Sequence, residues 1–286
     1  MKRLCPSWRP LGLYGILVGA GRSVSSTRVS GCSAGYLALL LGALVLACGN
    51  DRARDPSARL RVVIPVAVAS SMRAPFESLA AEFEATHPGA SVRASYLSSG
   101  AAYQQIVAGA PFVLFVSADT SYPAALVQAG HADSDSYRVY ARGVLALWVS
   151  NRLGAQAAAG AVALPRGVRR IAIANPELAP YGRAARQVLD HMDVSGVSII
   201  QGEDAAQAAQ LALASTDAAI LPLSLALLPA MSESGNVSLI ADSLYQPILH
   251  AAIMTARGDS GALALLDFLH SERALQLMAE YGYRAP

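Results

Sequence analysis

The feature that most constrains the fold of this chain is the alternation of short apolar runs with amphipathic stretches. The apolar runs are typical of buried strands, and the amphipathic stretches carry apolar residues at helical spacing. Strands are predicted at 62–68, 91–96, 112–117, 143–149, 171–174, 197–200, 218–223, 237–240 and 251–254. Helices are predicted at 72–86, 100–108, 120–129, 182–192, 204–214, 262–270 and 272–281. This alternation predicts an α/β fold with parallel sheets covered by helices on both faces.

Two of the predicted helices begin at turns that carry serines. Ala69-Ser70-Ser71 follows the first apolar run, and Ser98-Ser99-Gly100 follows the second. A helix start has backbone N–H groups without internal acceptors and the positive end of the helix dipole, and a serine there can cap the helix or donate outward. Two such starts at the carboxyl ends of parallel strands predict an anion pocket. The alternative, plain helix capping, is the commoner role of such serines.

Several segments, in the same order along the chain, resemble the periplasmic molybdate-binding proteins of ABC transporters. They are 109–119, 174–185, 202–207, and 267–274 with Tyr281-Gly-Tyr283. The most specific is Asn175-Pro-Glu-Leu-Ala-Pro-Tyr-Gly182, within the second segment. The resemblance spans about residues 60–286. It implies a two-lobed periplasmic-binding-protein fold of type II, in which each lobe is a doubly wound, mostly parallel sheet and the ligand lies in the interlobe cleft.

The resemblance also implies that the chain crosses between the lobes twice. We place the crossings near Tyr140 to Gly143 and near Tyr245 to Ala251. Lobe one is then expected to comprise 58–140 plus 247–286, and lobe two 141–246.

Ligand-binding residues can be inferred where the motifs of this chain match those of the family. Ser70, with Ser71 beside it, and Ser99 are expected to bind an oxyanion from lobe one. Tyr181 and Ala205 are expected to bind it from lobe two through their backbone N–H groups.

Some members of the family add a tyrosine hydroxyl from the strand that follows, and this chain has Pro222 at that position. Proline offers neither a hydroxyl nor an N–H group. We expect Tyr181 to replace the missing donor with its backbone N–H and its hydroxyl, with Ser224 or a water molecule as the alternatives.

The expected donors suit a tetrahedral dianion that is fully deprotonated, such as molybdate, tungstate or sulfate. Phosphate carries a proton at neutral pH and would leave that donor unpaired. The metal is expected to reach the protein only as the oxyanion, without direct metal ligands and without any other cofactor. Glu203 and Asp204 are expected to point away from the ligand, and Arg183 to lie on a solvated helix face rather than on the anion.

The N-terminal part has the pattern of an export signal. Five basic residues and no acidic ones precede the end of the apolar run 36–47, and Leu44 to Cys48 resembles a bacterial lipobox. We therefore predict a lipoprotein-type signal peptide at 1–47, acylation of Cys48, and a lipid-anchored linker at 48–59. The alternative is an uncleaved membrane anchor, and either reading places the rest of the chain outside the cytoplasm, in the periplasm or at the cell surface.

Charge and cysteine usage limit the function classes that remain. Without residues 1–47 the chain has 17 basic and 20 acidic residues, a net charge of −3, which argues against nucleic acid as a partner. All three cysteines lie at or before position 48, so no disulfide is expected in the folded part. The five histidines lack metal-ligand spacing and no Gly-x-Ser-x-Gly motif is present, so we do not expect an enzyme.

We therefore predict a monomeric binding protein that captures molybdate, or tungstate, by hinge closure and delivers it to an ABC permease and its ATPase. Two alternatives remain at this point. The chain could bind another tetrahedral oxyanion such as sulfate, or it could be a ligand-sensing module of the same fold.

Overall fold

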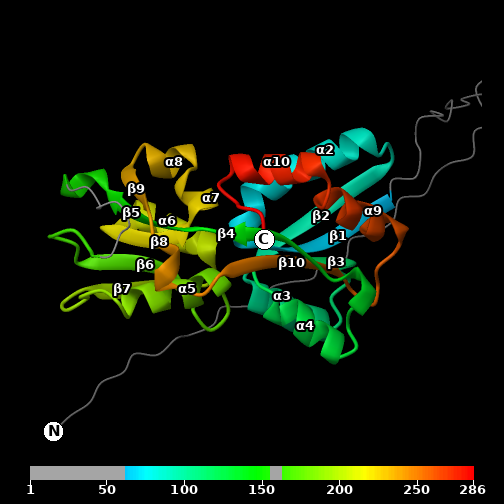
Figure 1. The fold of residues 1–286 in the computed structure, drawn as a ribbon, viewed down its shortest axis with the longest axis horizontal. Coiled ribbons are helices and arrows are strands. Elements are labelled where there is room, and N and C mark those ends of the chain that lie inside the picture. Colours follow the sequence, from blue (N-terminus) through cyan, green and yellow to red (C-terminus); the bar gives the residue numbers. More distant parts are fainter. Residues whose placement is uncertain (1–61, 155–162) are drawn as a thin grey trace, which may run out of the picture. The chain divides into compact units, whose positions relative to one another are not determined.

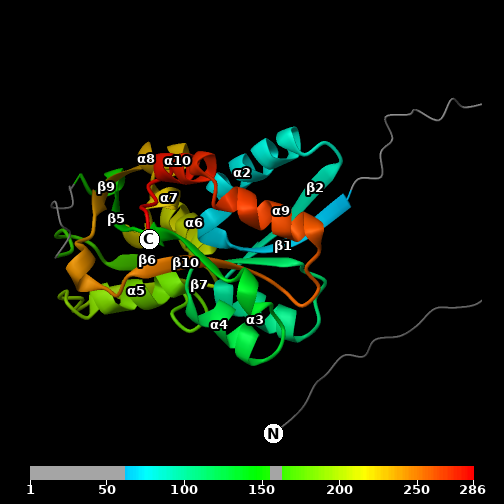
Figure 2. The same cartoon turned by 45° about the vertical axis from the view of Figure 1, so that its right-hand side comes forward.

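The computed structural model describes residues 62–154 and 163–286 of the 286-residue chain. The predicted signal peptide 1–47, the acylation site Cys48 and the linker 48–59 lie outside the described residues. The fold expected from the sequence is confirmed: the described chain forms two five-stranded sheets with helices packed on both faces (Figures 1 and 2).

The first sheet has the strand order β2-β1-β3-β10-β4. Its strands are β1 (Val62–Ala69), β2 (Ala90–Leu97), β3 (Leu114–Ser117), β4 (Arg138–Gly143) and β10 (Ile248–Met254). β10 runs antiparallel to both of its neighbours, so four of the five strands share one direction. The helices of this half are α2 (Arg73–Thr86), α3 (Ser99–Val107), α4 (Ser121–Gln128), α9 (Ser260–Leu269) and α10 (Glu272–Glu280).

Alternation along β1 explains why both faces of this sheet are covered. Val66 and Val68 pack in a core with α2, α9 and α10, whereas Ala67 packs in a separate core with α3 and α4. Successive side chains of a strand point to opposite faces, so a nearly continuous apolar run such as β1 is buried on both sides.

The second sheet repeats this arrangement with the order β7-β6-β8-β5-β9. Its strands are β5 (Leu145–Ser150), β6 (Arg170–Ala174), β7 (Ser198–Gly202), β8 (Ala218–Pro222) and β9 (Gly235–Leu239). Here β5 is the reversed strand, antiparallel to β8 and β9. The helices of this half are α5 (Pro180–Leu189), α6 (Ala205–Ser215), α7 (Leu223–Ala226) and α8 (Pro229–Ser232).

The two faces of the second sheet also have different cores. Leu145 and Leu147 of β5 pack with α5, while Trp148 of the same strand packs with α6. Figure 1 shows α5 near β7 at the lower edge of this half, and α7 and α8 near its upper edge.

The sequence did not predict β4, and the chain therefore leaves the first sheet later than expected. Residues 138–143 pair with β10, so the expected crossing at Tyr140 to Gly143 is a strand of the first sheet. The second sheet begins at Leu145, which leaves Val144 between the two sheets. On the return, the strand of the first sheet begins at Ile248, inside the expected crossing Tyr245 to Ala251.

Four short 3-10 turns complete the described structure: η1 (Ser70–Met72), η2 (Ser134–Ser136), η3 (Asn151–Leu153) and η4 (Asp242–Leu244). η1 joins β1 to α2 without a break, so the helical stretch after β1 begins at Ser70. Among the described residues, no helix has the length and apolar character needed to cross a membrane.

Candidate functional site

The two serine-bearing turns lie side by side at one edge of the first sheet. β1 and β2 are parallel neighbours in continuous register to Ala69 and Leu97, so the turns that follow them meet at the carboxyl ends of the strands. Ser98 caps α3, because its Oγ accepts the Ala101 N–H at 3.3 Å. Two helix starts, those of η1 and α3, therefore face the same space.

The second sheet brings two more helix starts to this space. α5 begins after Ala179 with Pro180 at its first position, and α6 begins at Ala205 after Asp204. The Asp204 carboxylate accepts the Gln207 N–H at 2.9 Å and so caps α6. The N–H groups of the first residues of each helix have no acceptor within the helix, and they carry the positive end of its dipole.

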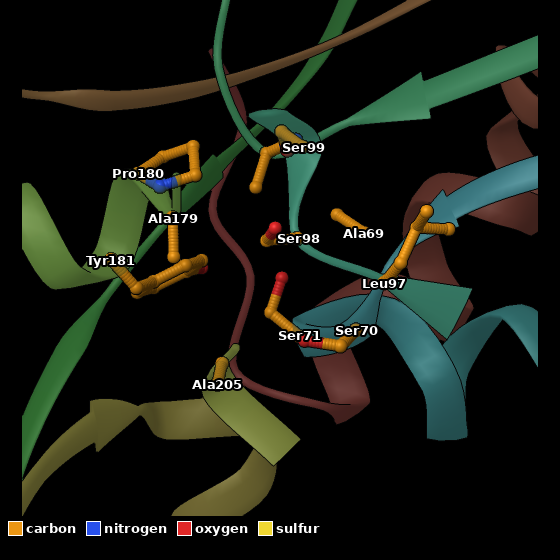
Figure 3. Close-up of a pocket in the computed structure, with 11 residues that line it drawn as sticks. Ala69, Ser70, Ser71, Leu97, Ser98, Ser99, Ala179, Pro180, Tyr181 and Ala205 are labelled. Carbon is orange, nitrogen blue, oxygen red and sulfur yellow. The ribbon is translucent and has the colours of Figure 1, made fainter. Parts of the chain in front are cut away.

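Together these turns surround one small pocket (Figure 3), and all five predicted ligand-binding residues line it. The predicted residues are Ser70, Ser71, Ser99, Tyr181 and Ala205, and the other lining residues are Ala69, Leu97, Ser98, Ala118, Ala179 and Pro180. The volume that the centre of a water-sized sphere can occupy in this pocket is about 10 Å³, which is enough for about one water molecule. None of these lining residues carries a charged side chain.

Two serine hydroxyls have hydrogen atoms available for a ligand. The Ser71 Oγ is buried, and within the described part of the chain it has no hydrogen-bond partner. In Figure 3 this oxygen points into the space between the two sheets. The Ser99 Oγ accepts the Ala118 N–H at 3.0 Å, which leaves its own hydrogen free to donate. A buried hydroxyl without a partner is costly, so the pocket favours a ligand that accepts hydrogen bonds.

The acidic residues beside the pocket do not face it. Glu203 is exposed, Asp204 is occupied as the cap of α6, and neither lines the pocket. The expectation that both carboxylates point away is confirmed. An anion would therefore meet neutral donors without repulsion from a neighbouring carboxylate.

Arg183 was expected on a solvated helix face, and that expectation is incomplete. Its guanidinium forms an ion pair with Asp119, which follows β3 of the first sheet, and lies 5.6 Å from the centre of the Tyr122 ring. It does not line the pocket. Arg183 therefore joins the two halves of the molecule beside the site.

The expected role of the Tyr181 hydroxyl is wrong. This oxygen lies 3.1 Å from the Nε2 of His250 in the interior, so its hydrogen-bond partner is a histidine of the first sheet. The Tyr181 hydroxyl packs closely against Gly143, because a Cβ added to this glycine would lie 2.0 Å from the hydroxyl oxygen. Pro222 ends β8 and does not line the pocket. Ser224 does not line the pocket either, and its hydroxyl donates a hydrogen bond to the Ser71 carbonyl at 2.9 Å.

Sequence reasoning missed a buried group of polar side chains behind the pocket. It consists of Tyr140, Tyr181, His250 and Tyr283, all at most 5% exposed. The rings of Tyr140, Tyr181 and Tyr283 stand edge-on around His250. Burial lowers the pKa of His250 to about 3 and raises the pKa of each tyrosine, so all four groups are neutral near pH 7. The Tyr-Gly-Tyr283 motif was a signal for this group, but its partners are distant in the sequence.

Metal ligation by the protein has no support in residues 62–154 and 163–286, where no three His, Cys, Asp or Glu side chains gather into a metal-binding group. The serine hydroxyls and helix starts that line the site make it a pocket of hydrogen-bond donors, suited to binding an anion.

Comparisons with known proteins agree with this geometry. Residues 64–284 match the family model for bacterial extracellular solute-binding proteins. The molybdate-binding protein ModA of Azotobacter vinelandii is 33% identical over 253 residues, 86% of this chain and 96% of that protein. ModA of Rhodobacter capsulatus is 33% identical over 224 residues, 76% of this chain and 86% of that protein.

A solved structure of similar fold is the periplasmic molybdate-binding protein of Azotobacter vinelandii. It matches with a TM-score of 0.67 and 30% sequence identity, covering 78% of this chain and 99% of that one. This similarity identifies the two-sheet architecture as a type II periplasmic-binding-protein fold. On these grounds the chain belongs to the family of bacterial extracellular solute-binding proteins.

Proposed function

We propose that this protein captures molybdate outside the cytoplasm and delivers it to an ABC permease driven by an ATPase. Two relatives at 33% identity are molybdate-binding proteins, and they support the choice of ligand. The anion would bridge the two halves, held by Ser70, Ser71 and Ser99 on one side and by the backbone N–H groups of Tyr181 and Ala205 on the other. Binding then favours the closed form by the difference in affinity between the closed and open states.

The observation that carries this proposal is the buried hydroxyl of Ser71, which has no hydrogen-bond partner among the described residues and lies in a pocket whose described lining has no charged side chain. Molybdate and tungstate are dianions that accept hydrogen bonds and donate none at neutral pH. Phosphate would add a donor, and without a carboxylate in the pocket that donor costs about 1–3 kcal/mol.

The size of the pocket also favours a small inorganic ion. Pockets for drug-sized organic ligands usually measure about 300–1,000 Å³. The space between these four helix starts is far smaller. A compact tetrahedral anion, surrounded by donors from both halves, is the class of ligand that this arrangement supports.

Titration calorimetry of the chain beginning after Cys48 tests the proposal, with molybdate, tungstate, sulfate and phosphate as separate titrants. We expect molybdate and tungstate to bind far more tightly than phosphate. Tighter binding of sulfate than of molybdate would assign the protein to another oxyanion. Binding of none of the four would overturn the proposed function.

The proposal also covers the membrane attachment, the oligomeric state, the cofactor and the activity of the protein. We infer a lipid anchor at Cys48 after removal of residues 1–47, a monomeric state, no cofactor besides the bound oxyanion, and no catalytic activity. Labelled fatty acid should enter the wild-type protein in its native host and should not enter a Cys48→Ala variant. Labelling that survives this substitution would refute the anchor without bearing on the ligand.

A further inference from the structure

The carbonyl oxygen of Ser71 is held by two hydroxyl groups from distant parts of the chain. The Ser224 Oγ donates to it at 2.9 Å, and the Tyr283 hydroxyl donates to it at 3.1 Å. Ser224 belongs to α7 of the second half, and Tyr283 follows α10 at the end of the chain. A carbonyl oxygen has two lone pairs, and two donors occupy both of them.

The path of the chain at Gly282 fixes Tyr283 in this place. Gly282 has φ of +82°, a conformation that L side chains rarely adopt, and an added Cβ would lie 2.7 Å from the Leu223 Cδ2. The last turn therefore packs closely on α7, next to Ser224. Tyr283 itself is 5% exposed, and its ring stands edge-on to His250 with ring centres 5.1 Å apart.

We propose that Tyr283 and Ser224 are positioning residues that set the affinity of the pocket by orienting Ser71. This proposal rests on the proposed function. A carbonyl oxygen beside an anion is repulsive, and the two donors hold this one on the side of Tyr283 and Ser224 and occupy its lone pairs. The Ser71 hydroxyl, left without an acceptor in the described chain, is then directed to the ligand.

The two positioning residues differ in the half from which they act. Tyr283 packs in the core of the first sheet, the half that also contains Ser71, whereas Ser224 reaches Ser71 from the second half. The Ser224 contact therefore requires the two halves to be together. The orientation of the turn that bears Ser71 therefore depends on Tyr283 and, through Ser224, on the contact between the two halves.

A Tyr283→Phe variant tests this inference, because it removes one hydroxyl and keeps the ring. The matched control is Tyr281→Phe: Tyr281 lies in the same tail, and its hydroxyl lies 2.9 Å from the Ser78 Oγ, away from the pocket. We expect Tyr283→Phe to raise the dissociation constant for molybdate about 3- to 10-fold and Tyr281→Phe to leave it unchanged. Ser224→Ala should raise it by a similar factor.

A double-mutant cycle separates positioning from a general loss of structure. If Tyr283 acts through the Ser71 hydroxyl, then Tyr283→Phe should change the dissociation constant less than about 2-fold in a Ser71→Ala background. Melting of the anion-free variants should show that Tyr283→Phe and Tyr281→Phe differ little in stability. Equal affinities of wild type and Tyr283→Phe, or the same loss in both backgrounds, would overturn the inference. Failure of the wild type to bind any oxyanion would refute the proposed function instead.

Discussion

The wall of the pocket that comes from the first sheet consists largely of serines, whereas the described residues of the wall from the second sheet include no serine or threonine. The first wall contributes Ser70, Ser71, Ser98 and Ser99. The second contributes Ala179, Pro180, Ala205 and the backbone of Tyr181, whose hydroxyl contacts His250. The first wall, which we call the serine wall, therefore relies on side-chain donors. The second, which we call the backbone wall, relies on the N–H groups of helix starts.

This difference determines how each wall can be altered. A side-chain donor is lost when serine is replaced by alanine, but a backbone donor survives every side-chain substitution that keeps the helix in place. The second wall can therefore accept many side-chain substitutions, but its N–H groups bind the ligand only if the helix starts keep their positions. Single variants that remove one donor, either a serine hydroxyl from the first wall or a backbone N–H from the second, compare the contributions of the two kinds of donor to binding.

The largest effect on binding is expected from Ala205→Pro. Ala205 is the first residue of α6, a position that accepts proline, and Asp204 before it is extended at φ −143° and ψ −177°. The substitution removes the backbone N–H and adds ring atoms to the pocket, so we expect a loss of about 3 kcal/mol in molybdate binding, roughly 100-fold. Glu272→Pro, at the first position of α10, is the matched control and should bind normally. Calorimetry that shows no loss for Ala205→Pro would exclude this N–H from the site.

On the serine wall, Ser99→Ala should weaken molybdate binding by about 2 kcal/mol. The variant loses a hydrogen bond to a charged ligand and also leaves the buried Ala118 N–H without its acceptor. Circular dichroism should show an intact fold, and Ser232→Ala on α8 serves as a control outside the pocket. Ser70→Ala should behave like Ser99→Ala. Unchanged affinity in a folded Ser99→Ala protein would remove this residue from the serine wall.

Acid should weaken the support of the backbone wall through His250. Burial lowers the pKa of His250 to about 3, below the value of 6.5 in an unfolded chain, so the unfolded chain binds a proton at higher pH. The contribution of neutral His250 to stability is complete above pH 6.5 and decreases as the pH falls towards 3. At pH 5.5 this costs about 1.4 kcal/mol of unfolding free energy.

Chemical denaturation between pH 7.5 and 5 measures this effect as the difference between wild type and His250→Asn. The wild type should lose stability more steeply on acidification, and a His191→Asn variant, altered at an exposed histidine, should follow the wild type. Parallel pH profiles for wild type and His250→Asn would show that His250 does not stay neutral in the folded protein.

The smallest effect is expected outside both walls, at the ion pair between Arg183 and Asp119. The side chain of Arg183 is 39% exposed, so solvent screening limits the pair to about 0.5–1 kcal/mol. Arg183→Gln should weaken molybdate binding about 2- to 5-fold, and less at high salt. Arg186→Gln is the matched control, because Arg186 of α5 pairs at 3.3 Å with Asp190, the C-cap residue of the same helix. Equal affinity of both variants would show that the interlobe pair does not contribute to closure.

The sequence predicted the serine wall well because its signals are local. An apolar strand followed by Ser70-Ser71 or Ser98-Ser99 and then by helical spacing defines a strand, a turn and a helix start within a few residues. Parallel pairing of β1 and β2 then brings the two turns together. The α/β class followed from the same alternation of apolar runs and amphipathic stretches.

The crossing between the sheets and the direction of the Tyr181 side chain were harder to predict because they depend on long-range contacts. β4 reads Arg-Val-Tyr-Ala-Arg-Gly, without a continuous apolar run, and is stabilised by its pairing with β10 about a hundred residues later. Tyr181 and His250 are 69 positions apart. No local pattern shows that the tyrosine hydroxyl points to this histidine rather than to the ligand, because tertiary packing determines the side-chain direction.

The strand order of the first sheet has a consequence for the biosynthesis of the protein. β10 lies between β3 and β4, so the first sheet cannot be completed until residues 248–254 have been made. The second sheet uses only β5 to β9, which are complete by Leu239. The half of the pocket that belongs to the second sheet can therefore assemble while the first sheet still lacks β10. Tyr283 follows β10 in the chain, so the turn that bears Ser71 gains this contact only after the last strand of the first sheet has been made.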